Sequence, residues 1–280
     1  MVRKIHVKEL TRIVQELCLD ANINAPKDVM IELKKSLKKE KSDLAAYCLQ
    51  SLVDNARIAK DNKLALCQDT GMVVVFLEIG QDVHLVGGDL SKAIDKGVRQ
   101  AYKTGYFRNS VVDPLSRKNT GDNTPAIIHT TIVPGSRIKI SVSPKGFGSE
   151  NMSAIKMFNP TASIEDITLF IVETVKVGGA RPCPPVIVGV GIGGTFEKAA
   201  LLSKHALMEP INNKKKSLPI RKVENVLLKK INALGIGPQG VGGKTTALKV
   251  NVMTHPTHIA GLPVAVNICC HALRHKEKII

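Results

Sequence analysis

The sequence predicts a mixed α+β fold, in which a helical N-terminal segment packs with short mixed sheets. Three observations lead to this prediction. Residues 7–60 place apolar side chains at helical spacing. Strand-like and helix-like segments then follow one another without the regular alternation of a doubly wound sheet. Cysteine-containing loops, rich in Pro, Gly and polar residues, adjoin three of the predicted strands.

Three helices are expected to open the chain, over residues 7–21, 27–40 and 42–60. Each segment repeats its apolar residues every three or four positions, which is typical of a helix with one buried face. Cys18 and Cys48 lie inside these amphipathic segments. Buried structural thiols are therefore the preferred interpretation of both.

Strands dominate the next part of the chain. Residues 72–79 and 83–86 are predicted to be paired strands, and a helix is expected over residues 90–104. Residues 126–133 and 137–142 are predicted to form a hairpin across Pro134-Gly135. A loop is expected from residue 144 to residue 153.

The second half of the chain contains both helix-like and strand-like segments. Its predicted helices and strands are, in order, helix 164–177, strand 185–190, helix 196–208, helix 223–234, strand 246–254 and strand 263–268. The charged segment 209–219 is expected to mark a lobe boundary. The chain as a whole, residues 1–280, is expected to form a single domain.

Composition narrows the class of protein. The net charge of +16 invites a nucleic-acid-binding interpretation, but aromatic residues make up only 3% of the chain, which disfavours a base-stacking platform. The lysines fall at helical spacings or in one short linker, as in 34–41, 214–216 and 229–230. A solvated surface is the preferred interpretation, and the positive field favours an anionic substrate or an acidic partner chain.

The same composition bears on location. No run of about 18 apolar residues occurs, so no membrane span is expected. The N-terminus turns charged at once and lacks the apolar region of a secretory signal, so a cytoplasmic protein is expected. In that compartment the six cysteines are metal-binding, catalytic or buried rather than disulfide-bonded.

Two glycine-rich segments resemble nucleotide-binding motifs. Residues 189–194 satisfy the dinucleotide pattern G-x-G-x-x-G, but no partner strand leads to Glu209, the candidate ribose-binding acid. The alternative is a glycine-rich strand end where the backbone approaches another backbone or a ligand closely. Gly243-Lys244-Thr245 resembles the end of a P-loop, yet the segment before it looks helical rather than like the strand that a P-loop requires. Both nucleotide-binding interpretations are therefore disfavoured.

Three other cysteines lie beside predicted strands. Cys67 and Cys183 come just before a strand, and Cys270 follows one. None belongs to a C-x-x-C pair, so a structural zinc site is poorly supported. Three thiolates on separate loops are able to hold three irons of a [4Fe-4S] cluster and leave the fourth iron open. Isolated structural thiols remain the alternative interpretation at this point.

At these residues the chain resembles the iron–sulfur-dependent class I fumarate hydratases, through their α subunit or N-terminal domain, and the related L-tartrate dehydratase α subunits. The resemblance runs in order along most of the chain. It is carried by residues 67–71, 119–126, 148–151, 183–185, 191–195, 237–245 and 267–270.

The resemblance implies a set of site residues. Cys67, Cys183 and Cys270 would bind a [4Fe-4S] cluster, with Cys269 as the competing choice for the third ligand. Asp69 would take part in catalysis and contact the substrate. The other expected substrate contacts are Gln68, Arg108, the backbone N–H of Gly148, and His258. Lys244 receives no role.

The resemblance also implies a reaction and a partner. The expected activity is that of a lyase that reversibly hydrates fumarate to L-malate, a tricarboxylic acid cycle step, with the open cluster iron as Lewis acid. Dehydration of L-tartrate is the alternative. A β subunit, equivalent to the C-terminal domain of the fused forms, is expected to complete a hetero-oligomer such as a dimer of αβ pairs and to supply the general base.

Overall fold

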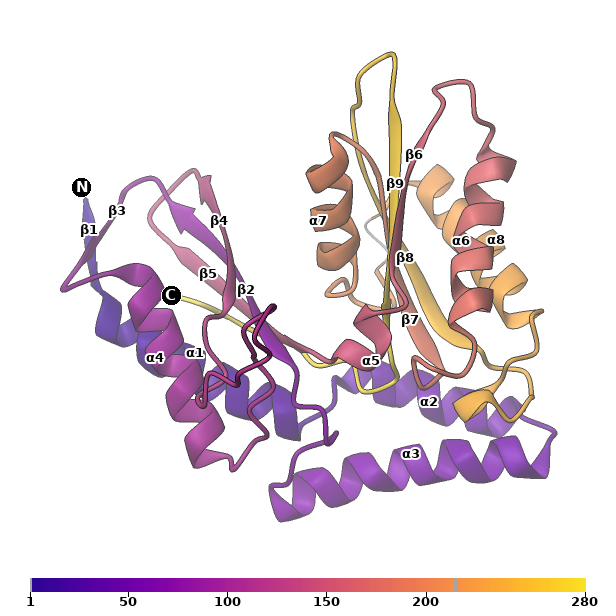
Figure 1. Cartoon of the computed structure of the whole chain (residues 1–280), viewed down its shortest axis with the longest axis horizontal. Helices are drawn as coiled ribbons and strands as arrows, with labels where there is room; N and C mark the ends of the chain where they lie inside the picture. The colour runs from indigo at the N-terminus through magenta and orange to yellow at the C-terminus, as the bar shows by residue number, and fades with distance from the viewer. Residues whose placement is uncertain (1, 214–215) are drawn as a thin grey trace. The chain divides into compact units, whose positions relative to one another are not determined.

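The computed structural model describes residues 2–213 and 216–280, and its contacts divide the chain into two compact units (Figure 1). Unit 1 comprises Met1–Ala25, Ala56–Phe147 and Arg274–Ile280, and unit 2 comprises Pro26–Asn55 and Gly148–Leu273. Segment 209–219 lies inside unit 2, so this division falls elsewhere than the expected lobe boundary. That residues 1–280 form a single domain stays a prediction. Lys214 and Lys215, of the predicted basic clusters, lie outside the described residues.

Unit 1 is a sheet covered by two helices. The sheet has the strand order β10-β5-β2-β4, and β1 pairs with β3 in a separate parallel ribbon. Its elements are β1 (Arg3–His6), α1 (Val7–Ile23), β2 (Met72–Gly80), β3 (Val83–Val86), α4 (Leu90–Thr104), β4 (Ile127–Val133), β5 (Ile138–Lys145) and β10 (Lys276–Ile279).

The core of unit 1 follows from two periodicities. Alternate residues of β2, such as Val73 and Val75, point to one face and meet the apolar faces of α1 and α4. Both helices begin at capped positions. The Asp89 side chain accepts a hydrogen bond from the Lys92 N–H, which satisfies one of the free amides at the start of α4.

Two predicted strand pairings are wrong in unit 1. Strand β2 pairs with β4 in parallel and with β5 in antiparallel orientation, and β3 pairs with β1. Strands β4 and β5 are therefore separated by β2 and form no hairpin. The reason is burial, because β2 is apolar along nearly its whole length and is most stable with a partner on each side. Strands β1 and β10 were not predicted.

Unit 2 is a four-stranded sheet with helices on both faces. Its strand order is β6-β9-β7-β8, with β7 parallel to β8 and antiparallel to β9. Its elements are α2 (Lys27–Lys39), β6 (Ala154–Phe158), α6 (Ile164–Gly178), β7 (Val186–Gly193), α7 (Phe196–Ala206), α8 (Leu218–Asn232), β8 (Ala247–His255) and β9 (Leu262–Cys269). Helices α3 (Asp43–Asn62) and α5 (Phe147–Glu150) cross the boundaries between units.

Close packing on β7 explains the glycine-rich segment 189–194. Figure 1 shows α7 on one side of the sheet and α6 with α8 on the other. A Cβ added at Gly189 or at Gly191 would lie 2.1 Å from a carbonyl oxygen of α7, that of Ser203 or Ala199. Most of this segment is strand rather than a strand-to-helix turn, so the dinucleotide-binding interpretation fails. Its alternative, close approach of two backbones, is confirmed.

Unit 2 differs from the sequence prediction in two further places. The loop expected at residues 144–153 contains the end of β5 and the single turn of α5, and strand β6 follows it. Helix α8 begins at Leu218, inside the segment expected to be a linker. The predicted α+β class is nevertheless confirmed, with a helical N-terminal segment and mixed sheets.

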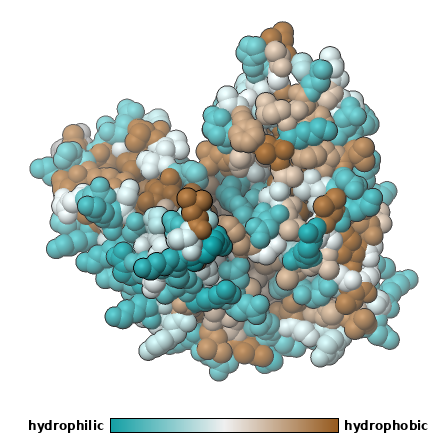
Figure 2. All heavy atoms as spheres, viewed as in Figure 1, coloured by the Kyte–Doolittle hydropathy of each residue, from teal (hydrophilic) through white to brown (hydrophobic). Residues whose placement is uncertain are grey.

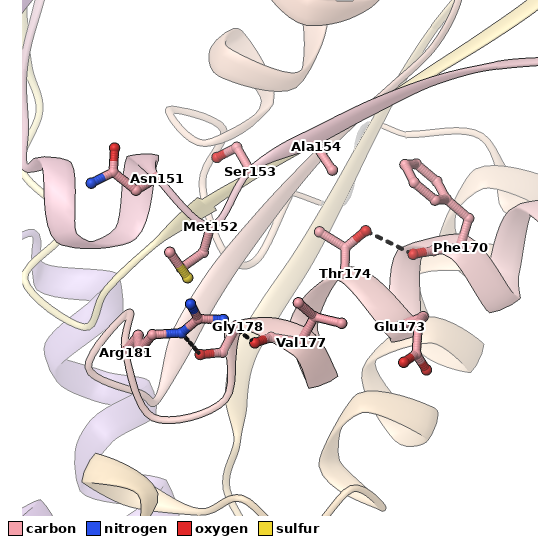
Figure 3. Close-up of a pocket in the computed structure, with 10 residues that line it drawn as sticks. All are labelled: Asn151, Met152, Ser153, Ala154, Phe170, Glu173, Thr174, Val177, Gly178 and Arg181. Carbon is pink, nitrogen blue, oxygen red and sulfur yellow. Dashed lines mark hydrogen bonds between the residues drawn. The ribbon is translucent and has the colours of Figure 1, made fainter.

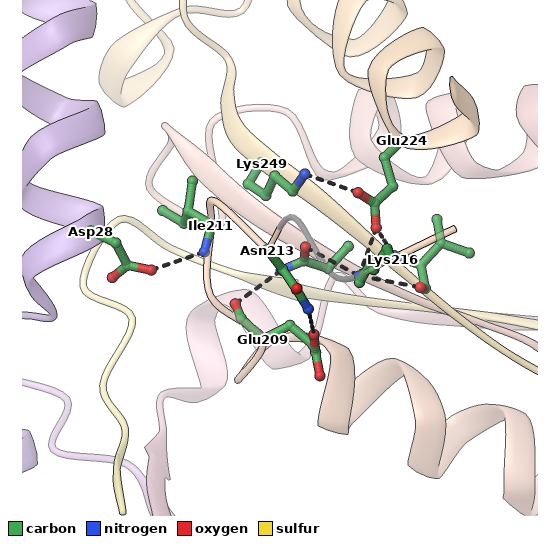
Figure 4. Close-up of polar contacts among 9 residues, drawn as sticks. Asp28, Glu209, Ile211, Asn213, Lys216, Glu224 and Lys249 are labelled. Atoms are coloured by element: carbon green, nitrogen blue, oxygen red, sulfur yellow. Dashed lines mark hydrogen bonds and ion pairs between the residues drawn. The ribbon is translucent and has the colours of Figure 1, made fainter. Parts of the chain in front are cut away.

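The segment before α8 is anchored by a buried carboxylate (Figure 4). Glu224 is 2% exposed and accepts from Lys216 Nζ at 2.7 Å, Lys249 Nζ at 2.9 Å and the Val252 N–H at 2.9 Å. Burial acts to raise the pKa of Glu224, but these hydrogen bonds outweigh it and leave the pKa below its ordinary value of 4.5. Upstream, the Asp28 carboxylate accepts from the Ile211 N–H at 2.9 Å.

The molecular surface agrees with the solvated-lysine interpretation. Hydrophilic side chains cover much of the face shown in Figure 2, and the lysines between residues 34 and 41 are exposed. Within residues 2–213 and 216–280, none of the helices combines the length and apolar character needed to cross a membrane.

We predict that Glu224→Gln lowers the free energy of unfolding by about 3 kcal/mol at neutral pH, because it leaves two largely buried lysines without their carboxylate. The pKa of Glu224 is depressed in the folded state. Its contribution is therefore complete above the ordinary value of 4.5 and is lost as the pH falls through the folded-state pKa. Urea unfolding of the unmodified chain and of Glu224→Gln, measured from neutral pH down through the folded-state pKa of Glu224, should show the difference in their free energies of unfolding shrinking on acidification.

Glu173→Gln is the matched control, since Glu173 pairs with Lys176 on an exposed turn of α6. A surface pair of this kind is worth at most about 1 kcal/mol. Equal losses in the two variants, or a Glu224→Gln deficit that grows in acid, would contradict this account of the buried network.

Candidate functional site

The Cys67 loop of unit 1 precedes β2 and is fixed by hydrogen bonds on both sides. The Leu66 N–H donates to the Asn22 carbonyl at 2.8 Å, and the Tyr102 hydroxyl donates to the Thr70 carbonyl at 2.6 Å. Gly71 has φ +77°, and a Cβ there would lie 2.6 Å from the Lys145 carbonyl carbon, so only glycine fits this turn. Cys67 itself is half-buried.

Asp69 has both carboxylate oxygens engaged. One accepts from the Gly71 N–H at 3.0 Å and the other from the Phe147 N–H at 2.7 Å. The first contact is the turn expected of an Asp before Thr-Gly. The second contact joins the Cys67 loop to the start of α5. The carboxylate is thus held in one orientation while the residue remains partly exposed.

Three segments that are distant in sequence meet at this loop. The Thr70 hydroxyl donates to the Arg108 carbonyl at 2.7 Å. The Asn123 amide, fully buried, donates to the Gly71 carbonyl at 3.1 Å and accepts from the Ser110 N–H. Unit 1 therefore gathers Gln68, Asp69 and Arg108 in one region. Gln68 and Arg108 are exposed.

Arg274 is a buried cation that sequence reasoning missed. It is 2% exposed, donates to the Asn22 side chain at 3.2 Å, and has a buried Nε without a hydrogen-bond partner among the described residues. A Cβ at Gly146 would lie 3.0 Å from an Asp69 oxygen and 3.2 Å from Arg274 Nη2. Arg274 and Asp69 thus flank Gly146, and a positive charge lies close to the predicted catalytic carboxylate.

In unit 2, strand pairing brings Cys183 and Cys270 to the same end of the sheet. Cys183 lies just before β7 and Cys270 just after β9, and the antiparallel register pairs Ile187 with Cys269. Cys183 is exposed, with φ +53°, and Cys270 is half-buried. The expectation that these loops lie at strand ends is confirmed.

The two candidates for the third ligand differ in environment. Cys269 is 4% exposed and packs in an apolar cluster with Ile187, Leu207 and Leu273. Cys270 is the next residue, beyond the last residue of β9, and is more exposed. Successive side chains of a strand point to opposite faces, so a core position for Cys269 favours Cys270 as the accessible thiol. Burial also raises the pKa of the Cys18 thiol, which disfavours a thiolate there.

Two further residues connect the Cys183 and Cys270 loops, and sequence reasoning missed both. His271 Nδ1 lies 3.0 Å from the Cys183 carbonyl oxygen. Gln239 donates to the Pro184 carbonyl through its backbone N–H and through Nε2, each at 2.8 Å. The signals in the sequence were that His271 directly follows Cys270 and that Gln239 lies in segment 237–245, which carries the family resemblance.

Gly148 lies in the single turn of α5 and is exposed. The nearest atom to an added Cβ would be the Arg181 carbonyl oxygen at 4.0 Å, so the space beside it is open. The same turn is tied to β9, because Glu150 accepts from Asn267 Nδ2 at 3.0 Å and pairs with Lys204. The turn that carries Gly148 is thereby anchored to Asn267, which lies three residues before Cys270 in the sequence.

A groove of about 410 Å³ lies between β6 and α6 (Figure 3). Met152, Phe170 and Val177 give it an apolar wall, and Arg181 donates to the Gly178 and Val177 carbonyls at the end of α6. None of the predicted substrate-binding residues lines it. The groove is therefore not the predicted dicarboxylate site.

His258 lies away from the cysteine pair within unit 2. It is exposed in the loop between β8 and β9, where its Nδ1 accepts from the Ala260 N–H at 3.1 Å. Cys270 follows the opposite end of β9, eight residues of strand away. At about 3.3 Å per residue, the strand separates the two by more than 20 Å. The predicted substrate contact of His258 stays a prediction.

Lys244 belongs to a loop rather than a P-loop. Residues 237–243 contain a 3₁₀ turn, and strand β8 follows instead of a helix. The Lys244 N–H donates to Glu40 at 2.8 Å. Partial burial acts to raise the pKa of Glu40, but this bond and those from the Lys41 and Ser42 amides outweigh it and lower the pKa. The P-loop interpretation is excluded.

The predicted ligand set is divided between the units. Cys67 belongs to unit 1, and Cys183 and Cys270 belong to unit 2. In the part of the chain that the structure describes, no group of three or more Cys, His, Asp or Glu side chains is assembled to hold a metal ion. Metal binding by the three cysteines stays a prediction.

Comparison with known proteins supplies the family. The family profile described as fumarate hydratase (Fumerase) matches residues 11–278. A putative L(+)-tartrate dehydratase subunit alpha from Methanocaldococcus jannaschii is 40% identical over 280 residues, which covers 97% of this chain and 98% of that protein. The L(+)-tartrate dehydratase alpha subunits of Escherichia coli K12 and Shigella sonnei are each 30% identical, covering 98% of this chain and 91% of theirs. The chain therefore belongs to the class I fumarate hydratase family of hydro-lyases.

Proposed function

We propose that this chain is the α subunit of a [4Fe-4S]-dependent hydro-lyase that reversibly hydrates fumarate to L-malate. One observation carries the proposal beyond family membership. The β7–β9 pairing brings two of the three predicted ligand loops, those of Cys183 and Cys270, to one end of a sheet, and hydrogen bonds join them. A chain with unrelated structural thiols has no need of such an arrangement.

The cysteines present suit the proposed cluster. Thiolates are the usual protein ligands of iron–sulfur clusters, and three of them leave one iron open. Cys67, Cys183 and Cys270 lie on loops and are exposed or half-buried, whereas Cys18 and Cys269 are in apolar cores. When bound, the cluster supplies a Lewis acid for a substrate oxygen.

The remaining roles fall to polar groups of the chain. The Arg108 guanidinium binds one substrate carboxylate through paired hydrogen bonds. The Gln68 side chain and the Gly148 N–H bind substrate oxygens. Asp69, already oriented by the Gly71 and Phe147 amides, keeps further lone pairs with which to position the base that moves the carbon-bound proton. His258 lies at the opposite end of β9 from Cys270, so within this unit it does not reach substrate held at the cysteine pair, and its substrate contact stays a prediction.

L-Tartrate is the second candidate substrate. Several relatives of this chain carry the name tartrate dehydratase, and one of them is 40% identical. Tartrate differs from malate by one additional hydroxyl group. A site built to hydrogen-bond a hydroxyl rejects the analogue that lacks it, so the two substrates are expected to differ strongly in kcat/KM.

We also propose a β subunit as obligate partner, in a hetero-oligomer such as a dimer of αβ pairs. The relatives are named alpha subunits, which supports a second chain that completes the site and supplies the base. A cytoplasmic location suits thiols that must remain reduced.

Anaerobic reconstitution with iron and sulfide tests the cluster. We predict broad visible absorbance, together with bound iron and sulfide, in the unmodified chain. Cys67→Ala, Cys183→Ala and Cys270→Ala should each lose most of both, because each removes a ligand. Cys48→Ala, Cys18→Ala and Cys269→Ala are the controls and should retain them. Full cluster content in Cys270→Ala with loss in Cys269→Ala would move the ligand to Cys269.

Activity of the reconstituted chain, with and without its β subunit, tests the reaction. We predict hydration of fumarate with both chains and at least about tenfold less with this chain alone, a loss of about 1.4 kcal/mol of transition-state stabilisation. Fumarate is followed by its ultraviolet absorbance and tartrate by oxaloacetate release. A normal rate without the β subunit would refute the partner, and a higher kcat/KM for L-tartrate would replace fumarate as substrate.

A further inference from the structure

The glycine-rich loop from Gly237 to Gly243 lies between α8 and β8. Its sequence resembles part of a P-loop, yet strand β8 follows it. It packs against the segment that carries Cys183. A Cβ at Gly240 would lie 2.3 Å from the Ala180 Cβ, so the two loops approach as closely as glycine allows.

Gln239 is held in an unusual conformation at the centre of this contact. Its φ is +52°, in the left-handed backbone region that residues other than glycine rarely adopt. Its backbone N–H and its Nε2 both donate to the Pro184 carbonyl oxygen, each at 2.8 Å. One acceptor, directly after Cys183, thus receives both donors. The conformation is strained, and strain of this kind persists where surrounding contacts fix it.

His271 makes the matching contact from the other cysteine loop. Its Nδ1 lies 3.0 Å from the Cys183 carbonyl oxygen, which is able only to accept, so Nδ1 carries the proton. The same Nδ1 is 3.5 Å from Gln239 Nε2. Because His271 follows Cys270 in the sequence, these contacts fix the backbone of both cysteine loops. They hold Cys183 and Pro184 in one loop and His271 in the other.

We propose that Gln239 and His271 are positioning residues that hold Cys183 and Cys270 as a ready-made pair of thiols, with the glycine-rich loop 237–243 as the brace behind them. This inference rests on the proposed function, because it assigns the pair to the cluster.

The placement of the contacts separates positioning from simple folding. Both side chains donate to carbonyls of the Cys183–Pro184 segment. Cys183 is exposed and lies outside β7, so neither burial in the core nor the strand ladder fixes it. Its own N–H donates to the Ala180 carbonyl at 3.0 Å, within the segment against which Gly240 packs. The brace and this turn together therefore set where an exposed thiol lies. The partners of metal ligands commonly act in this way, by orienting the ligand before the metal binds.

Two readouts on the full-length chain test the brace. The first is the rate at which the reconstituted cluster loses iron to a chelator under anaerobic conditions. The second needs no cluster: dibromobimane joins two nearby thiols by forming two C–S bonds as two C–Br bonds break, releasing two bromide ions and two protons, and peptide mass spectrometry locates the bridge. Urea unfolding of the same variants without the cluster reports any general loss of stability.

The variants are Gln239→Leu, His271→Ala and His271→Asn. Leucine keeps most of the glutamine shape without its donor, and the Asn amide nitrogen occupies nearly the place of Nδ1. Gln100→Leu on α4 and His84→Ala on β3 are controls in unit 1, whereas the Cys183 and Cys270 loops belong to unit 2. We expect Gln239→Leu and His271→Ala to lose iron about tenfold faster or more, as for other partners of metal ligands. His271→Asn should restore retention, and Cys183–Cys270 bridging should follow the same order.

Unchanged retention and bridging in both Gln239→Leu and His271→Ala would overturn the proposal, as would an unmodified chain that forms no Cys183–Cys270 bridge. If Gln239→Leu fails to fold, the comparison of His271→Asn with His271→Ala tests the proposal. If His271→Ala fails to fold, Gln239→Leu alone tests it. Bridging that depends on Gln239 and His271 in a chain that takes up no cluster would support the brace while refuting the iron–sulfur function.

Discussion

The antiparallel register between β7 and β9 is the constraint that brings the Cys183 and Cys270 loops together. It pairs Ile187 with Cys269 and so brings the loop before β7 and the loop after β9 to one end of the sheet. The register is enforced by packing, because Gly189 and Gly191 allow α7 to lie directly on β7 and Cys269 fills the core. A slip by one residue would exchange the environments of Cys269 and Cys270.

Unit 1 reaches a comparable precision by hydrogen bonding around a single loop. The Asp69 carboxylate is fixed by two backbone amides, and Tyr102 and Asn123 hold the carbonyls of Thr70 and Gly71. Buried polar groups of this kind are stable only when they are satisfied, and a complete network specifies one geometry. The buried Arg274 stands apart, since its Nε is unsatisfied in the described part of the chain and its charge lies close to Asp69.

The sequence predicted the helices well because their periodicity is local, and α1, α4 and α6 lie close to their expected bounds. Strand neighbours were harder, because nothing in the sequence near β4 and β5 shows that β2 lies between them. The glycines of β7 matched a nucleotide-binding pattern for a reason that only packing reveals. The positions of Cys67, Cys183 and Cys270 on loops beside strands were predictable from their flanking residues, whereas His271, Gln239 and Arg274 act through contacts between distant segments.

Mössbauer spectroscopy of the iron-loaded protein with its β subunit tests the central claim most directly, namely that three cysteines leave one iron of the cluster open to substrate. Adding fumarate or L-malate is expected to change the signal of one iron in four and to leave the other three unchanged. Signals of all four irons that stay unchanged when substrate is added, or a purified protein that holds no iron–sulfur cluster, would contradict the open iron site.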